Sequence, residues 1–187
     1  MPSKTQGTAV EPSLRLFFAL WPDADARAAL NQAGKRLYKT WGGRRMRSDT
    51  LHLTLAFLGD TPASRLEELH SLAGSISAEK FTLNLDQPGC WSHNKVGWLG
   101  PSETPPALVK LVMRLEVTLE AGHFHFDKRP HVPHVTLLRN AFCTPPPLCQ
   151  PVVWQVERFA LVASRSAQTG AYYEVIGDWP MRGNIDV

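Results

Sequence analysis

The sequence lacks the features that mark membrane proteins and disulfide-rich proteins. No apolar run approaches the roughly 20 residues that span a bilayer, and the first residues contain no apolar segment typical of a signal peptide. Only three of the 187 residues are cysteine (Cys90, Cys143 and Cys149), and they form no CxxC spacing. We therefore expect reduced thiols in a cytoplasmic protein, rather than a disulfide framework or a zinc site.

Motifs of several enzyme classes are missing as well. There is no Gly-rich phosphate loop of the Walker type, which argues against a dedicated NTPase. Ser164 and Ser166 lie in no GxSxG motif, so a serine hydrolase would have no nucleophile. His123, His125 and His131 cluster, but their spacing matches no standard metal-ligand motif. We expect these histidines in a solvated loop, with a metal site as the weaker alternative.

One pattern is present twice: His–x–Thr–Leu occurs at His52 and again at His134, 82 residues later. Each copy lies in an apolar run with period-two alternation, which predicts a strand. Side chains two positions apart on a strand share a face, so each histidine lies beside its threonine, Thr54 or Thr136. A single copy would have no specificity, but two matched copies indicate a functional pair of acid–base groups.

Each half of the chain contains a strand, a long helix and a motif strand. We expect strands over residues 14–20, 51–59, 81–86, 96–100, 133–139, 156–164 and 172–178, helices over 23–38, 61–76 and 105–120, and a turn at residues 88–89. This order predicts two βα lobes related by a pseudo-two-fold axis, with both histidines in one cleft. Residues 1–13 are expected to form a flexible tail and residues 14–187 a single bilobal domain.

Basic residues gather before both motifs, although the net charge of the chain is only +3. Residues 1–50 hold nine Lys or Arg against four Asp or Glu. Those closest to the first motif are Lys35, Arg36, Lys39, Arg44, Arg45 and Arg47, and Lys128 and Arg129 precede the second. Solvated surface is the alternative, but the clustering favours a guide for a polyanion.

The paired motifs and their flanking residues make the sequence similar to the two-histidine phosphoesterase superfamily. Within it, the chain resembles the bacterial RNA 2′,3′-cyclic phosphodiesterases, also called 2′-5′ RNA ligase-like proteins. The likeness covers nearly the whole chain and includes residues 15–20, 51–60, 98–100, 133–139 and 156–164. It implies an α+β fold of two pseudo-symmetric lobes, each an antiparallel sheet with helices on the outer face, and an active cleft between the lobes.

The resemblance also implies an activity. This is metal-independent hydrolysis of RNA 2′,3′-cyclic phosphate ends to 2′-phosphomonoesters, with reversible 2′-5′ RNA ligation as a second reaction. His52 is the expected proton donor and His134 the proton acceptor, roles that suit imidazoles with an ordinary pKa of about 6.5. Thr54 and Thr136 are expected to bind the non-bridging phosphate oxygens. The scheme needs no metal and no cofactor.

Phe57 and Arg139 each follow a motif histidine by five residues. The resemblance implies that Phe57 stacks on the terminal base and that Arg139 binds phosphate, chemistry that suits both side chains. Five is an odd spacing, so on a regular strand both side chains would face away from the histidines. A bulge or the end of the strand must turn them, and for Phe57 a place in the core is the alternative.

These observations favour an enzyme that acts on RNA with 2′,3′-cyclic phosphate ends or on cyclic nucleotides. We expect a cytoplasmic monomer without a membrane partner or an obligate protein partner. The alternative is an RNA- or nucleotide-binding protein of the same fold with incidental catalysis. The matched histidines favour the enzyme, because a binding protein has no need of two proton carriers.

Overall fold

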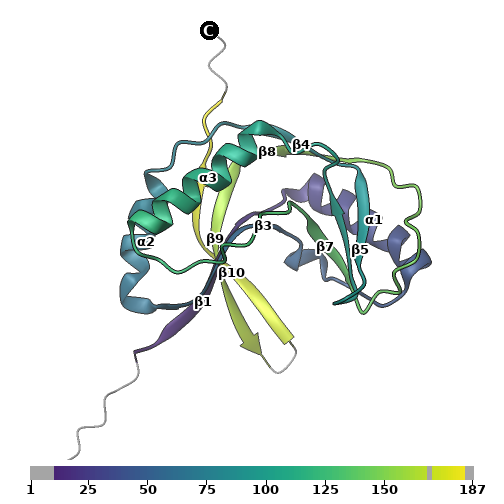
Figure 1. Cartoon of the computed structure of the whole chain (residues 1–187), viewed down its shortest axis with the longest axis horizontal. Helices are drawn as coiled ribbons and strands as arrows, with labels where there is room; N and C mark the ends of the chain where they lie inside the picture. Colours follow the sequence, from purple (N-terminus) through teal and green to yellow (C-terminus); the bar gives the residue numbers. More distant parts are fainter. Residues whose placement is uncertain (1–10, 168–169, 184–187) are drawn as a thin grey trace, which may run out of the picture.

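The computed structural model describes residues 11–167 and 170–183, which form an arch of two lobes (Figure 1). The main sheet has the strand order β10-β9-β1-β3-β7-β6-β5, with the short β2 beside β7. The first lobe contains β1 (Ser13–Leu20), β3 (Leu53–Pro62), β9 (Arg158–Ala167) and β10 (Gly170–Pro180). The second contains β2 (Arg44–Arg45), β5 (Gln87–Trp91), β6 (Val96–Gly100) and β7 (Val135–Arg139). All these strand pairs are antiparallel, which confirms the expected α+β fold.

The two lobes share one backbone pair, Leu53 of β3 with Val135 of β7. Each of these residues directly follows a motif histidine, so the two partners hold the same position in the two motifs. The order β9-β1-β3 on one side of the pair mirrors β5-β6-β7 on the other. A pseudo-two-fold axis therefore passes between the motifs, as the repeated pattern predicts.

The helices cover the sheet (Figure 1). The long helix of each half of the chain packs against the lobe whose motif strand belongs to the other half. α1 (Ala24–Trp41) follows β1 and yet packs against β7, where Gly34 lies against the Leu137 side chain. α3 (Pro106–Ala121) follows β6 and packs against β3, beside α2 (Leu66–Gly74). The expectation that each half builds its own βα lobe is wrong in this respect, because the segments after β1 and β6 cross the axis.

Local signals set the ends of α1. The Asp23 side chain caps the helix by accepting a hydrogen bond from the Ala26 amide at 2.8 Å. Gly42 ends it with a φ of 56°, a left-handed value that costs glycine little. The helix therefore begins where the sequence predicts and runs past the expected end at Tyr38 to Trp41.

The sequence does not predict β2, β5 or β8 (Val152–Val156), the last of which pairs with β4 (Phe81–Leu85) in a separate antiparallel ladder. Pro88 and Gly89, expected as a turn, belong to β5 at the end of the sheet order. Glycine is needed there for close packing, since a Cβ at position 89 would lie 2.1 Å from the Trp98 ring. The Pro–Gly signal thus marks an edge strand rather than a turn.

The segment between β3 and α2 also differs from expectation. β3 extends to Pro62, and a 3₁₀ turn (Ala63–Arg65) precedes α2, so the second helix begins later than expected. The Ala63 amide donates a hydrogen bond to the Pro12 carbonyl at 2.9 Å. Residues 11–13 of the expected tail therefore contact the first lobe, and residues 1–10 lie outside the described residues.

A continuous apolar core fixes which face of the motif strands is buried. The stripe expected on α3 is buried and consists of Leu108, Leu111, Val112, Leu115 and Leu119. Leu53 and Val135 are fully buried in the same core. Since neighbouring strand residues face opposite ways, this burial directs the motif histidines and threonines away from the core. Among the described residues, no helix has both the length and the apolar character needed to cross a bilayer.

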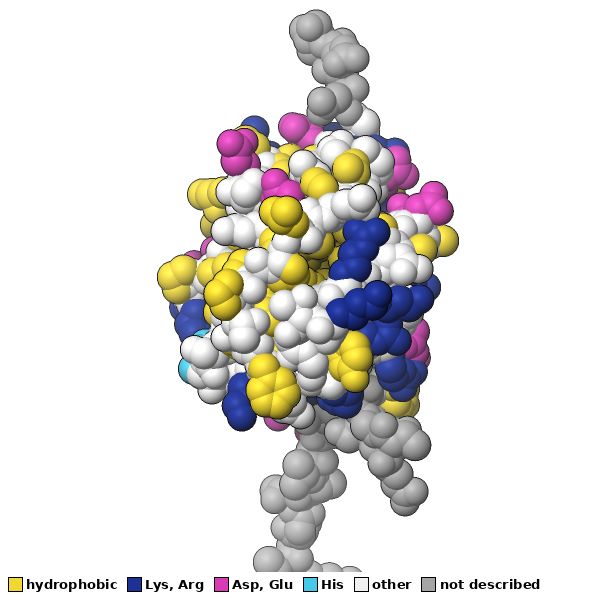
Figure 2. Space-filling view, turned by 90° about the vertical axis from the view of Figure 1, so that its right-hand side faces the viewer, with side chains coloured by type: hydrophobic (Ala, Val, Ile, Leu, Met, Phe, Trp, Pro, Cys, Tyr) yellow, Lys and Arg dark blue, Asp and Glu magenta, His cyan; other side chains and the backbone are white. Residues whose placement is uncertain are grey.

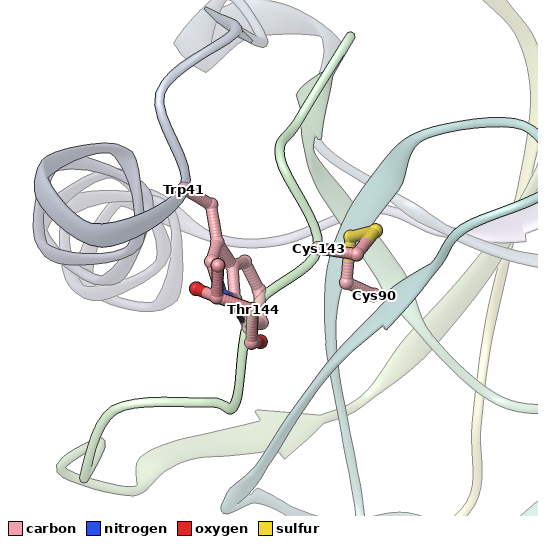
Figure 3. Close-up of a disulfide and its surroundings, with 4 residues drawn as sticks. All are labelled: Trp41, Cys90, Cys143 and Thr144. Atoms are coloured by element: carbon pink, nitrogen blue, oxygen red, sulfur yellow. Dashed lines mark hydrogen bonds between the residues drawn. A yellow bond between two sulfur atoms is a disulfide. The ribbon is translucent and has the colours of Figure 1, made fainter.

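The cysteines depart from the prediction of reduced thiols. Cys90 of β5 and Cys143, in the segment after β7, form a disulfide (Figure 3), and Cys149 is a free thiol. Their Cα atoms lie 5.4 Å apart because pairing through β6 brings together segments that are 53 residues apart in the chain. The same segment is held by Trp41, whose Nε1 donates to the Thr144 carbonyl at 3.0 Å (Figure 3). The prediction is therefore wrong for this pair.

Removing the disulfide should lower the free energy of unfolding. A crosslink between residues 53 positions apart restricts the unfolded chain, and such a restriction contributes about 2–4 kcal/mol. We expect Cys90→Ser to lose about this amount in urea denaturation, and dithiothreitol to cause the same loss in the wild type. Cys149→Ser is the control, because it removes a thiol without removing a crosslink. Equal stability of Cys90→Ser and wild type under oxidising conditions would contradict the crosslink.

Candidate active site

The two motif histidines occupy equivalent places at the starts of β3 and β7. Nδ1 of His52 lies 2.7 Å from the carbonyl oxygen of Thr50. Nδ1 of His134 lies 2.7 Å from the carbonyl oxygen of Val132. A carbonyl oxygen only accepts hydrogen bonds, so each Nδ1 carries a proton and donates it. Nε2 of each ring is therefore the atom left for proton transfer.

The register of β3 and β7 aligns the two motifs. Because Leu53 lies opposite Val135 in antiparallel strands, each motif histidine falls level with the threonine of the other motif. Level positions on neighbouring strands share a face. The sheet thus places two imidazoles and two hydroxyls together on the face that turns away from the core.

These four side chains line a cavity of about 320 Å³. Phe57 and Arg139, the other residues that the sequence analysis selected, line it as well. Arg15 of β1 also lines the cavity, with its guanidinium carbon 4.8 Å from the centre of the Phe57 ring. All six predicted site residues therefore lie in one place, and their chemical roles stay predictions.

A β-bulge in each motif strand turns Phe57 and Arg139 into the cavity. β3 contains a residue, Leu55, that has no partner on β1. β7 contains the equivalent residue, Leu137, without a partner on β6. One extra residue reverses the alternation of faces, so a side chain five positions after each histidine returns to the histidine's face. The odd spacing is explained by these bulges, and Phe57 is a cavity residue rather than a core residue.

Aromatic side chains that the sequence analysis did not select surround His52. Trp21 stacks on the imidazole, with 5.6 Å between ring centres and 9° between planes. The rings of Phe17 and Tyr173 lie 4.9 Å and 5.2 Å from it. The alternation of residues along the first strand, which is visible in the sequence, predicts that Arg15 and Phe17 share one face. The position of this strand beside the motif strand is a tertiary feature.

His134 has an aromatic enclosure in the second lobe. The Trp91 ring meets it edge-on at 4.6 Å, and the Trp98 ring lies 6.4 Å away. Trp91 directly follows Cys90, whose disulfide partner, Cys143, lies in the segment after β7. The crosslink therefore joins β5, which carries Trp91, to the segment after β7.

The histidine cluster before the second motif does not form the solvated group expected of it. His131 is half-buried, and its Nε2 donates a hydrogen bond to the Thr54 carbonyl at 2.9 Å. This bond ties the segment before β7 to β3, so the expectation is wrong for His131. His123 and His125 are exposed. Within residues 11–167 and 170–183, no group of three or more His, Cys, Asp or Glu side chains is placed to hold a metal ion.

Burial lowers the pKa of both motif histidines. For His52 the loss of solvent dominates, the hydrogen bond to the Thr50 carbonyl opposes it, and the charges of His134 and Arg139 lower the pKa further. For His134 burial also dominates, with the Val132 carbonyl opposing it. Both rings therefore favour the neutral form in the free protein, and a bound anion would favour the protonated form.

Comparison with known proteins gives consistent matches. A family model described as LigT-like phosphoesterase matches residues 20–98. The RNA 2′,3′-cyclic phosphodiesterase of Escherichia coli K12 is 36% identical over 169 residues, which cover 89% of this chain and 96% of that protein. The protein of the same name from Thermus thermophilus is 31% identical, and the match covers 91% of both chains. The crystal structure of E. coli LigT complexed with 3′-AMP superposes with a TM-score of 0.81 at 35% identity, covering 91% of this chain and 99% of that one.

Removing the stacked Trp21 should raise the pKa of His52. We expect both histidines to titrate below the ordinary value of about 6.5 in the wild type, because burial disfavours the charged rings. Trp21→Ala admits water to His52 and should move its pKa toward the ordinary value of about 6.5, while that of His134 stays unchanged. Imidazole signals followed by NMR against pH measure both values. A shift of His134 by the same amount would show that Trp21 does not act through burial of its neighbour.

Proposed function

The chain belongs to the LigT-like phosphoesterase family, and from this we propose that it is an RNA 2′,3′-cyclic phosphodiesterase. It hydrolyses 2′,3′-cyclic phosphate ends to 2′-phosphomonoesters. One observation carries the proposal: both motif histidines line one cavity, and each has its Nδ1 bound to a carbonyl oxygen and its Nε2 left for the substrate. Two imidazoles in this arrangement supply an acid and a base on either side of a phosphate.

The reaction is a displacement at phosphorus with two proton transfers. Neutral His134 takes a proton from the attacking water through Nε2, and the water oxygen forms a bond to phosphorus. The bond between phosphorus and O3′ breaks, and protonated His52 gives its Nε2 proton to O3′. The product is a 2′-phosphate beside a free 3′-hydroxyl. At the end of the reaction His134 is protonated and His52 is neutral, and proton exchange with water restores the starting forms. No step calls for a metal ion.

The remaining polar side chains of the cavity act on the phosphate. Thr54 and Thr136 donate hydroxyl hydrogen bonds to the non-bridging oxygens, which gain negative charge in the transition state. Arg139 adds a positive charge on the same face as the motif side chains, because the bulge in β7 turns it there. Its planar guanidinium can bind two phosphate oxygens at once.

The terminal base stacks on Phe57, with a contribution of about 1–3 kcal/mol. The Arg15 guanidinium already lies over one face of the Phe57 ring. The base can stack on the other face, so that the phenyl ring lies between the base and the guanidinium. Binding the base on the first lobe and the phosphate between the lobes leaves one ribose oxygen next to His52. This positioning selects one ribose oxygen and a single product, and the family resemblance implies that the oxygen is O3′.

The same geometry permits reversible RNA ligation. If a 5′-hydroxyl replaces water as the attacking group, breaking the bond to O3′ produces a 2′-5′ phosphodiester. His134 takes the proton of that hydroxyl and His52 again protonates O3′. The energy comes from the strained cyclic phosphate, so no nucleotide-activation site is required.

We propose a monomer, and we place it in the cytoplasm on the ground of its RNA substrate alone, because the disulfide Cys90–Cys143 removes the support that reduced thiols were expected to give. Both histidines and the phosphate-binding side chains come from one chain, and RNA is the substrate. The alternative of a binding protein with incidental catalysis has less support. The curated relatives are named as phosphodiesterases, and this chain has a complete pair of proton carriers.

Replacing either motif histidine should abolish most of the hydrolysis. We expect His52→Ala and His134→Ala each to lower kcat about 100-fold or more on an RNA oligonucleotide with a 2′,3′-cyclic phosphate end. The assay contains EDTA, and phosphorus NMR should identify a 2′-phosphate as the only product of the wild type. His125→Ala is the control, because that side chain is exposed and outside the cavity. Near-normal turnover of either motif variant, or a 3′-phosphate product, would overturn the assignment.

The dependence of kcat/KM on pH should be bell-shaped with an acidic optimum. His134 must be neutral and His52 protonated, so activity falls below the pKa of His134 and above the pKa of His52. Burial lowers both values in the free enzyme, which moves both limbs toward lower pH than for ordinary histidines. Bound substrate carries negative charge and favours protonated rings, so the limbs of kcat should lie at higher pH than those of kcat/KM. A profile without an alkaline limb would contradict an imidazolium as the acid.

A further inference from the structure

We propose that Arg44 forms a second phosphate site, which binds the phosphodiester on the 5′ side of the cyclic nucleotide. The inference rests on the proposed function and deepens it. It makes the end of an RNA chain, rather than a cyclic mononucleotide, the preferred substrate. The basic surface of α1 and β2 then attracts the rest of the chain toward this site.

The pairing of β2 places Arg44 at the edge of the catalytic cavity. Arg44 lies directly opposite Arg139 in the antiparallel pair of β2 and β7. Opposite residues in such a pair share a face, and Arg139 lines the cavity. Met46, which directly follows β2, lines the cavity as well. Arg44 is not itself a lining residue, and its pairing with Arg139 places it at the rim of the cavity.

The part of the chain that the structure describes supplies no counter-charge to this pair of arginines. Like charges directly opposite each other on a sheet are destabilising. Among the described residues, neither Arg44 nor Arg139 forms an ion pair with an Asp or Glu side chain, whereas Arg47 does so with Asp49. Both arginines are exposed. An anion between or beside them would relieve the repulsion, and an RNA end provides two neighbouring anions.

The charge continues over the outer side of the second lobe. Figure 2 looks at the side of the molecule on which α1 lies and shows Lys and Arg side chains gathered in one band. The exposed basic residues of α1 and β2 are Lys35, Arg36, Lys39, Arg44 and Arg45. Such a band raises the local concentration of a polyanion and steers it toward the cleft. Among these exposed basic residues, Arg44 is the one that the β2 register places opposite Arg139 of the proposed phosphate site.

A pair of substrates that differ by one phosphodiester tests the site. The wild type is assayed with a 2′,3′-cyclic mononucleotide and with a dinucleotide that ends in the same cyclic nucleotide. We expect the dinucleotide to have the higher kcat/KM. The ratio of interest is kcat/KM for the dinucleotide divided by kcat/KM for the mononucleotide. Arg44→Gln should lower this ratio about 10-fold, the effect of losing a charged hydrogen bond to phosphate. Arg44→Lys, which keeps the charge, should restore part of the ratio.

Two control variants separate a local contact from general attraction. Arg45→Gln removes the same charge from the next residue of β2, whose side chain faces the opposite way. Lys110→Gln removes an exposed charge from α3, on the other lobe (Figure 1). We expect neither to change the ratio by more than about twofold at moderate salt, since screening weakens distant charges. The slope of log kcat/KM against log salt for the dinucleotide should become shallower by about 1 in Arg44→Gln.

The outcomes distinguish this inference from the proposed function. A wild type that cleaves neither substrate would overturn the function itself. A wild type that cleaves both, with the same ratio in Arg44→Gln, would overturn only the second phosphate site. If Arg45→Gln lowered the ratio as much as Arg44→Gln, long-range attraction of RNA by the basic surface would explain the preference, and a direct contact with Arg44 would not. An equal loss on both substrates in Arg44→Gln would place Arg44 at the reacting phosphate instead. Thermal unfolding of each variant checks that the fold is retained.

Discussion

The pairing of Leu53 with Val135 is the contact on which the site depends. These residues hold the same position in the two motifs, so their pairing places the pseudo-two-fold axis between the motifs. Both side chains are fully buried, and the register cannot slip by one residue without exposing them. The histidines and threonines are thereby fixed on the opposite face. One buried pair therefore sets the positions of both motif histidines and both motif threonines.

The environment of the histidines balances two opposing effects. Hydrogen bonds from Nδ1 to backbone carbonyls favour the protonated rings and fix their orientation, while aromatic enclosure favours the neutral rings. Burial is the larger effect in the free protein for both. Negative charge from a bound phosphate would shift the balance toward the protonated rings. In the proposed reaction, the enclosure by rings such as Trp21 and Trp91 would couple the protonation of the histidines to substrate binding.

The lobes are held together by more than the shared strand pair. α1 and α3 each pack on the lobe that the other half of the chain builds, so neither lobe is formed by a continuous half. His131 ties the segment before β7 to the Thr54 carbonyl of β3. Within the second lobe, the disulfide Cys90–Cys143 joins β5 to the segment after β7. These ties cross between segments far apart in the chain. The exchanged helices and the His131 hydrogen bond thus connect the two lobes whose motif strands line the cavity.

Local patterns in the sequence were enough to identify the motif strands, the three helices and the paired histidines and threonines, and the family resemblance added Phe57 and Arg139. All six side chains are among those that line the cavity. The local patterns sufficed because alternation, capping residues and the repeated histidines depend on near neighbours along the chain. The bulges at Leu55 and Leu137 were required by the odd spacing of Phe57 and Arg139 but could not be placed. Strand β5, the disulfide, the exchange of helices and the opposition of Arg44 to Arg139 were decided only in the folded chain. Each of these depends on which distant segments pair, and pairing is settled by the shape of the shared core rather than by any local signal.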